Sequence, residues 1–267
     1  MSSPRPGARQ RRLGQNFLRD PNLLDAIVRD SGVGARDVVL EVGGGGGALT
    51  QRLAPAVARL HVVEVDEHLR PDLGGLAADL GNVEVHWGDA MRLDLTSLRP
   101  PPVALVANLP YAVATPLLLR TIELLPSVRA WTVMVQLEIA ARLAATPGSR
   151  TYGSPSVLAQ LACEVRLVRR VDRAVFSPRP RVDSAILRLD RLDRRGPGAD
   201  AELRRLVRGA FAHRRKALAG SLALAEPKLD RDRVRAALAG AGLPEDARAE
   251  ALAPEDFARL AARLGTP

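Results

Sequence analysis

A short segment, Asn108-Leu109-Pro110-Tyr111, directly follows the apolar run 103–107 and carries residue types suited to the chemistry of an amine. The exocyclic amine of a flat base such as adenine is a poor nucleophile, because its lone pair is delocalised into the ring. Two acceptors aimed at its hydrogens, the Asn108 side-chain oxygen and the Leu109 carbonyl, would localise that lone pair. Pro110 would stiffen the backbone, and Tyr111 would offer the base a stacking face. The segment predicts an amine-methylating site, although a turn that simply ends a strand has the same composition.

Three further motifs each follow an apolar run. The glycine-rich turn 43–47 would let a cofactor lie against the backbone. Glu64 could bind ribose hydroxyls, and Asp89, within Gly88-Asp89-Ala90, could accept from an adenine amino group. Each motif alone is also compatible with a tight turn or a solvated acid. Together they favour a nucleoside sulfonium such as S-adenosyl-L-methionine over NAD, because a NAD enzyme has no use for the 108–111 segment.

The elements that must position these motifs alternate along the chain. Short apolar runs predict buried strands at 37–42, 60–65, 83–87, 103–107 and 131–136. Amphipathic stretches predict helices near 48–55, 67–80, 115–125 and 137–145. This alternation predicts an α/β fold with a mostly parallel sheet. Such sheets bind ligands at the carboxyl ends of their strands, which is where all four motifs fall.

The pattern changes after residue 146, and it suggests an appendage. Two further strands are expected at 165–171 and 182–189, followed by a charged Gly/Pro linker and then by helical patterns only, at 201–223, 230–241 and 254–264. We therefore expect a basic N-terminal arm over 1–20, a catalytic domain over 21–194 and a small all-α C-terminal domain over 195–267.

Composition narrows the class of protein. The net charge is +9 and the sequence pI is about 11.0, which suits a polyanionic partner such as nucleic acid. Only two of the 39 basic residues are lysine, so codon bias contributes to the arginine content as well. Cys163 is the single cysteine and the four histidines show no ligand spacing, so neither a disulfide nor a metal is expected. With no membrane-length apolar run and no secretory signal, a cytoplasmic protein is expected.

These motifs resemble the rRNA adenine N6,N6-dimethyltransferase family, which implies a class I methyltransferase with a Rossmann-like sheet. The resemblance covers nearly the whole chain, from LGQNFL at 13–18 through NLPY to FSPRPRVDSAILRL at 176–189. The segments at 213–222 and 248–261 favour the branch that modifies small-subunit rRNA. They argue against the large-subunit enzymes that confer macrolide resistance, and the intact motifs argue against a binding protein without catalysis.

The resemblance also implies roles for single residues. Phe176 would stack on the target adenine opposite Tyr111, although a core position is equally compatible with its sequence. Asn108, Leu109, Pro110 and Tyr111 would act on the amine. The cofactor would be held by Asn16, Leu18, Gly43, Glu64, Asp89 and Asn108. RNA would be bound by Arg179, Arg181, Arg214, Arg215 and Lys216, the last three of which fit a solvated helix face equally well.

The implied substrate is a pair of adjacent adenines in the 3′-terminal hairpin of 16S rRNA, within an assembling small ribosomal subunit. A monomer that needs no metal is expected. Two departures from the family pattern concern the glycine turn. Gly44 stands where Pro is usual, and Gly46 stands where a larger side chain is usual. We expect a more flexible turn and weaker cofactor binding from these departures. Ala112-Val113-Ala114 replaces a common Asn-Ile-Ser without removing a proposed catalytic group.

Overall fold

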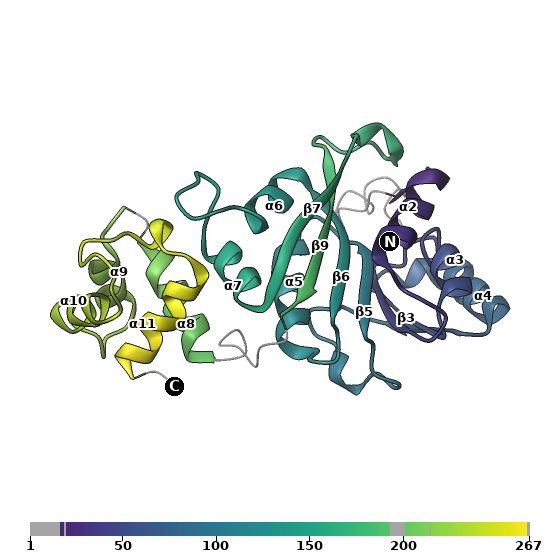
Figure 1. Ribbon diagram of the computed structural model, residues 1–267. Coiled ribbons are helices and arrows are strands. Elements are labelled where there is room, and N and C mark those ends of the chain that lie inside the picture. Colours follow the sequence, from purple (N-terminus) through teal and green to yellow (C-terminus); the bar gives the residue numbers. More distant parts are fainter. Residues whose placement is uncertain (1–16, 19, 193–200, 214, 266–267) are drawn as a thin grey trace, which may run out of the picture. The chain divides into compact units, whose positions relative to one another are not determined.

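The computed structural model describes residues 17–18, 20–192, 201–213 and 215–265. Contacts divide these residues into two compact units (Figure 1). The first unit comprises the described residues of 1–140 together with 166–191, and the second comprises those of 141–165 and 192–267. Most of the expected basic arm therefore lies outside the described residues.

A seven-stranded sheet organises the first unit, with strand order β4-β3-β2-β5-β6-β9-β7. Five strands are parallel, and β9 runs antiparallel to β6. The bounds are β2 Val38–Val42, β3 Arg59–Glu64, β4 Val83–Trp87, β5 Ala104–Asn108, β6 Ala130–Gln136, β7 Cys163–Val171 and β9 Ser184–Arg191. The expected Rossmann-like α/β fold is confirmed, and the five strands first predicted form its parallel part.

Helices connect these strands. They are α2 Pro21–Ser31, α3 Thr50–Leu53, α4 Arg70–Leu80, α5 Ala114–Leu124 and α6 Leu137–Leu143. Asp20 caps α2 by accepting a hydrogen bond from the Leu23 N–H at 3.0 Å, and Pro21 opens the helix. Short 3-10 turns occur at Ala54–Ala56, Glu67–Leu69, Leu95–Ser97 and Arg173–Val175.

A two-stranded ladder, which the sequence did not suggest, joins distant parts of the first unit. Strand β1, Phe17–Leu18, pairs antiparallel with β8, Phe176–Ser177. Leu18 and Phe176 both lie in the hydrophobic core with Ile27 of α2, Val106 of β5 and other buried residues. The ladder thus anchors the start of the described chain beside the sheet.

The second unit is helical and draws on two stretches of the chain. Its helices are α7 Ser154–Ala162, α8 Ala201–Ala212, α9 Leu218–Ala225, α10 Arg231–Gly240 and α11 Pro254–Leu264, with a 3-10 turn at Ala249–Ala251. Tyr152 is fully buried here, and its hydroxyl donates to the Leu252 carbonyl at 2.9 Å. The boundary expected near 195 assigned 141–165 to the catalytic domain, whereas their contacts lie in this unit.

The helical pattern expected over 201–223 forms two helices, α8 and α9. The Lys216 N–H donates to the His213 carbonyl at 2.9 Å, which closes a turn between α8 and α9. Among the described residues, no helix is long and apolar enough to cross a membrane.

Candidate active site

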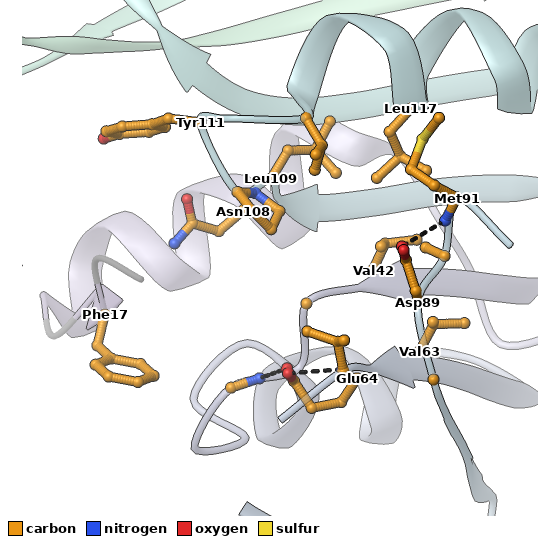
Figure 2. Close-up of a pocket in the computed structure, with 17 residues that line it drawn as sticks. Phe17, Val42, Val63, Glu64, Asp89, Met91, Asn108, Leu109, Tyr111 and Leu117 are labelled. Carbon is orange, nitrogen blue, oxygen red and sulfur yellow. Dashed lines mark hydrogen bonds between the residues drawn. The ribbon is translucent and has the colours of Figure 1, made fainter. Parts of the chain in front are cut away.

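A pocket opens at the carboxyl ends of β2, β3 and β5, and we call it the strand-end pocket. It encloses roughly 780 Å³ of empty space, a volume that includes its open mouth. Figure 2 shows its lining, in which Asn108 and Tyr111 lie toward the same side as Phe17. All four sequence motifs contribute to it. The lining includes Phe17, Gly43, Gly45, Glu64, Asp89, Asn108, Leu109, Pro110 and Tyr111.

The glycine turn is shaped by its hydrogen bonds and by close neighbours. Gly43 has φ of 82°, and its N–H donates to the Val63 carbonyl at 2.8 Å. A Cβ atom at this position would lie 3.6 Å from the Asn108 carbonyl oxygen. Gly45 has φ of 56°, and its N–H donates to Glu64 Oε2 at 2.8 Å. Glycine is favoured at both positions because other residues rarely adopt positive φ.

Glu64 ends β3 and is held by main-chain donors. Its Oε1 atom accepts from the N–H groups of Val65 and Asp66, each at 2.8 Å. Its Oε2 atom accepts from Gly45, so one carboxylate fixes both the turn and the end of the strand. Although only 3% exposed, Glu64 lines the pocket, so its remaining acceptor capacity faces any ligand there.

Asp89 lies across the pocket, after β4. Its Oδ1 atom accepts from the Met91 N–H at 2.9 Å, and Figure 2 draws this bond. The side chain is 45% exposed and makes a long ion pair of 3.7 Å with Arg92. The ion pair is made by the second oxygen, Oδ2, and the exposure of the side chain leaves this atom accessible as an acceptor from an amine.

The target segment is positioned by β5. Asn108 is the last residue of this strand and pairs with Met134 of β6. The Leu109 N–H donates to the Met134 carbonyl at 3.1 Å, and the Leu109 side chain is 2% exposed. The Val113 N–H donates to the Pro110 carbonyl at 3.1 Å, which closes the turn. Strand pairing thus fixes the backbone on which the two proposed acceptors lie.

Tyr111 is oriented by a residue that the sequence did not single out. Its hydroxyl lies 2.6 Å from the Oγ atom of Ser184, which is fully buried at the start of β9. Burial raises the pKa of Tyr111, although the Ser184 contact partly offsets that rise. The phenol therefore stays neutral, and the ring is held by its far end. Only strand pairing brings these residues together, so no local pattern could have revealed the contact.

Glu41 lies beneath the glycine turn, in β2, and is 1% exposed. Its Oε2 atom accepts from the Thr50 hydroxyl at 2.7 Å. Burial, with a smaller contribution from the charge of Glu64, raises the pKa of Glu41 to about 8. The side chain is therefore protonated at neutral pH and adds no charge below the pocket.

The family of this chain follows from its sequence as a whole. Residues 8–265 match the family model described as Ribosomal RNA adenine dimethylase. The chain belongs to that family. It is 45% identical to Ribosomal RNA small subunit methyltransferase A of Rubrobacter xylanophilus, covering 98% of this chain and 96% of that one. It is 44% identical to the protein of that name from Rhodococcus opacus, covering 94% and 88%.

Solved structures of two related enzymes share the architecture. A dimethyladenosine transferase from Plasmodium falciparum superposes with a TM-score of 0.79 at 26% identity, covering 93% of this chain and 98% of that one. The 23S rRNA methyltransferase ErmE superposes with a TM-score of 0.71 at 30% identity, covering 94% and 100%. The chain is therefore a methyltransferase of the rRNA adenine dimethylase family.

The dimethylase resemblance implied two residues whose side chains are placed elsewhere. Phe176 is 5% exposed and lies in the core, which is the second of the two positions expected for it, and it does not line the strand-end pocket. Leu18 is also in the core, and its neighbour Phe17 lines the pocket instead. Alternation along β1 explains this difference, because adjacent strand residues point to opposite sides. Asn16 lies outside the described residues.

The basic residues expected to bind RNA fall in both units. Arg179 and Arg181 are exposed in the loop after β8, where the Arg181 carbonyl accepts from the Arg173 guanidinium at 3.0 Å. Arg215 and Lys216 are exposed in the second unit, between α8 and α9. Arg214 lies outside the described residues. None of the described four lines the strand-end pocket.

Proposed function

We propose that this dimethylase transfers methyl groups from S-adenosyl-L-methionine to N6 of two adjacent adenosines in the 3′-terminal hairpin of 16S rRNA. The observation that carries the proposal is the position of Asn108 and Leu109. They lie at the end of β5, which its pairing with β6 holds in place. They line the same pocket as two carboxylates, Glu64 and Asp89. A target amine and a nucleoside can thus meet in one cavity.

The lining suits a nucleoside sulfonium. The turn at Gly43 and Gly45 brings main chain, without side chains, to the pocket wall. Glu64 would accept from ribose hydroxyls, and Asp89 would accept from the adenine amino group. The sulfonium supplies an electrophilic methyl group when it is bound. We further propose that Asn16 and the main chain of Leu18 complete this part of the site, since the Leu18 side chain is in the core.

The catalytic task of the chain is to prepare the amine. The Asn108 side-chain oxygen and the Leu109 carbonyl would accept hydrogen bonds from the two N–H groups of the amine. These hydrogen bonds would turn the nitrogen lone pair toward the methyl group. The ring of Tyr111 would hold the base by stacking. Because transfer from a sulfonium releases a neutral thioether, the chain needs no acid to assist the leaving group. The positively charged N6 formed by the transfer then loses one proton to solvent. The RNA must present its base unstacked, which a hairpin loop allows at modest cost.

Small-subunit RNA is favoured as the substrate by the relatives. The two relatives quoted above carry names that refer to the small subunit. The net charge of +9 suits an rRNA within an assembling subunit. We propose that exposed Arg179, Arg181, Arg215 and Lys216, together with Arg214, bind its phosphates, and that the protein acts in the cytoplasm as a monomer.

The test is transfer of a labelled methyl group to immature small subunits, followed by mapping of the modified bases. Two adjacent dimethyladenosines near the 3′ end of 16S rRNA are expected. Isolated 23S rRNA is the matched alternative substrate, because ErmE is named for it. Modification of 23S rRNA with none of 16S rRNA would reject the proposed substrate. An absence of transfer to either, with RNA binding intact, would reject catalysis.

Replacing Asn108 with Ala tests the assignment of the amine acceptors. Loss of a preorganised acceptor should lower the transfer rate by about 100-fold or more. RNA binding, measured by filter retention or gel shift, should remain within about twofold, because Asn108 does not contribute charge. Persistence of methylation near the wild-type rate would show that the amine is activated by other groups.

A further inference from the structure

Strand pairing brings together two histidines that are far apart in the sequence. His61 lies on β3 and His86 on β4, and the Nδ1 atom of His61 is 3.0 Å from Nε2 of His86. Glu84 pairs directly with His61 in the parallel register. Its carboxylate oxygens lie 3.7 Å from His61 Nδ1 and 4.0 Å from His86 Nε2. The histidines show no ligand spacing in the sequence, and only the pairing of β3 with β4 places these two side by side.

The ring of His61 is already set as a metal ligand would be. Its Nε2 atom lies 2.9 Å from the Pro100 carbonyl oxygen, which can only accept a hydrogen bond. The proton of a neutral His61 ring is therefore on Nε2, and the Nδ1 lone pair points toward His86. Metal-binding histidines commonly donate their other N–H to a backbone carbonyl in this way. Full burial of His61 fixes the ring further.

The other two groups remain open to solvent. The side chain of His86 is 25% exposed and that of Glu84 is 42% exposed, so an ion can enter and keep a water ligand. Arg59 holds Glu84 through Oε2, whereas the contact of Glu84 with His86 is made by Oε1. Arg59 thus orients the carboxylate, although its positive charge opposes a cation and should limit the affinity.

We propose that His61, Glu84 and His86 form a site for a divalent cation that prefers nitrogen and oxygen ligands, such as Zn²⁺. These are ligand types that zinc takes in proteins, and the three ligand atoms lie within 4.8 Å of one another. Two Zn–N bonds of about 2.05 Å at a tetrahedral angle would place the nitrogens about 3.3 Å apart. The two nitrogens therefore need to separate by only ~0.3 Å, while the rings, whose nitrogens now face each other, must turn so that both lone pairs converge on the ion.

A bound ion would replace the proton that joins the two rings and would tie β4 to β3. None of the three ligands lines the strand-end pocket. The site is therefore separate from the strand-end pocket, and it can be tested without cofactor or RNA. The alternative is that the two rings only form a hydrogen bond with each other. In that case the protein takes up no metal ion.

The test uses the full chain without an affinity tag, stripped of metal with a chelator. Titration calorimetry with Zn²⁺ should show one ion per chain, and Co²⁺ should give the absorption bands of a tetrahedral site. His86→Ala should weaken binding at least about tenfold and abolish those bands. His68→Ala is the matched control, because His68 is exposed in the same unit and outside the cluster. It should bind as the wild type does.

Glu84→Gln keeps the shape of the side chain and tests the third ligand. It should weaken Zn²⁺ binding at least about tenfold, while its metal-free melting curve shows that the variant is folded. Equal binding by the wild type and His86→Ala, or no binding by the wild type, would overturn the proposal. Unchanged binding by Glu84→Gln would also overturn the three-ligand site.

Discussion

The orientation of the Tyr111 ring depends on one contact between two hydroxyl groups. Ser184 is fully buried, and its Oγ atom lies 2.6 Å from the Tyr111 oxygen. The contact lies at the far end of the ring, so the ring faces remain available for a base. A tyrosine that stacks through its faces and is anchored through its tip can be rigid without losing its binding surface.

Replacing Ser184 with Ala should release this ring. We expect a loss of ~1 kcal/mol in stability, because one hydrogen bond is removed. The value of kcat/KM for RNA should fall about five- to tenfold, since a mobile ring holds the base less well. Thermal unfolding and steady-state methylation measure the two effects separately.

Tyr111→Phe provides the control for this prediction, because it removes the same hydrogen bond while keeping the ring. Adding Ser184→Ala to Tyr111→Phe should cost nothing further in kcat/KM. If Ser184→Ala is as harmful in the Tyr111→Phe background as in the wild type, Ser184 acts on something other than Tyr111.

At the scale of the element, packing around the glycine turn explains why Gly44 stands where the family usually has proline. A Cβ atom at Gly44 would lie 2.5 Å from Val62 Cγ1 and 3.0 Å from Leu73 Cδ2. The Gly47 N–H also donates to the Gly44 carbonyl at 2.9 Å. The space that a proline at 44 would use is filled by core side chains. Packing, rather than a demand for a loose turn, accounts for glycine at this position.

A pair of alanine substitutions in this turn should behave in opposite ways. Gly44→Ala should destabilise the protein by ~1–3 kcal/mol, because the added methyl group overpacks the core. Gly46 has no neighbour within 4 Å of such a methyl group, and its φ is not positive. Gly46→Ala should therefore be neutral or should stabilise by ~0.4–1 kcal/mol. Denaturant unfolding of both variants is the measurement, and equal losses would contradict the packing argument.

The parallel strands could be predicted from the sequence because they lie in the middle of the fold. Central parallel strands are buried on both faces, so they appear as continuous apolar runs, and their ends locate the pocket. The β1–β8 ladder has only two residues in each strand, which is too short to leave a periodic pattern.

The residues of the candidate site could be predicted where they lie at or directly after the end of a strand. Gly43, Glu64, Asp89 and Asn108 all line one pocket, as parallel topology requires. Phe17 and Ser184 were missed because their positions depend on pairing between distant segments. The sequence left two positions open for Phe176 for the same reason, since its motif does not say which way the ring faces.

At the scale of the whole molecule, Glu41 makes stability depend on pH. Its pKa is about 8 in the folded protein, against an ordinary value of 4.5. An unfolded chain ionises this group above pH 4.5, whereas the folded chain keeps it protonated. The contribution of Glu41 to the free energy of unfolding should therefore be greatest below that pH. It should fall by up to ~1.4 kcal/mol per unit until about pH 8.

Glu41→Gln removes this dependence while keeping an acceptor for the Thr50 hydroxyl. Denaturant unfolding at several pH values between 5.5 and 8.5 should show the variant gaining stability relative to the wild type as pH rises. Parallel curves for the two proteins would mean that Glu41 does not titrate in this range.

The second unit also bears on how this chain can be recombined with others. Tyr152 and the Leu252 carbonyl that it contacts are a hundred residues apart, yet both lie within that unit. A single crossover near residue 195 would transplant the C-terminal helices without the 141–165 stretch packed among them. Chimaeras that exchange the helical part between relatives therefore need two further junctions, one before residue 141 and one after residue 165. The helical unit is built from two separate segments of the chain, so it cannot be exchanged as one continuous segment.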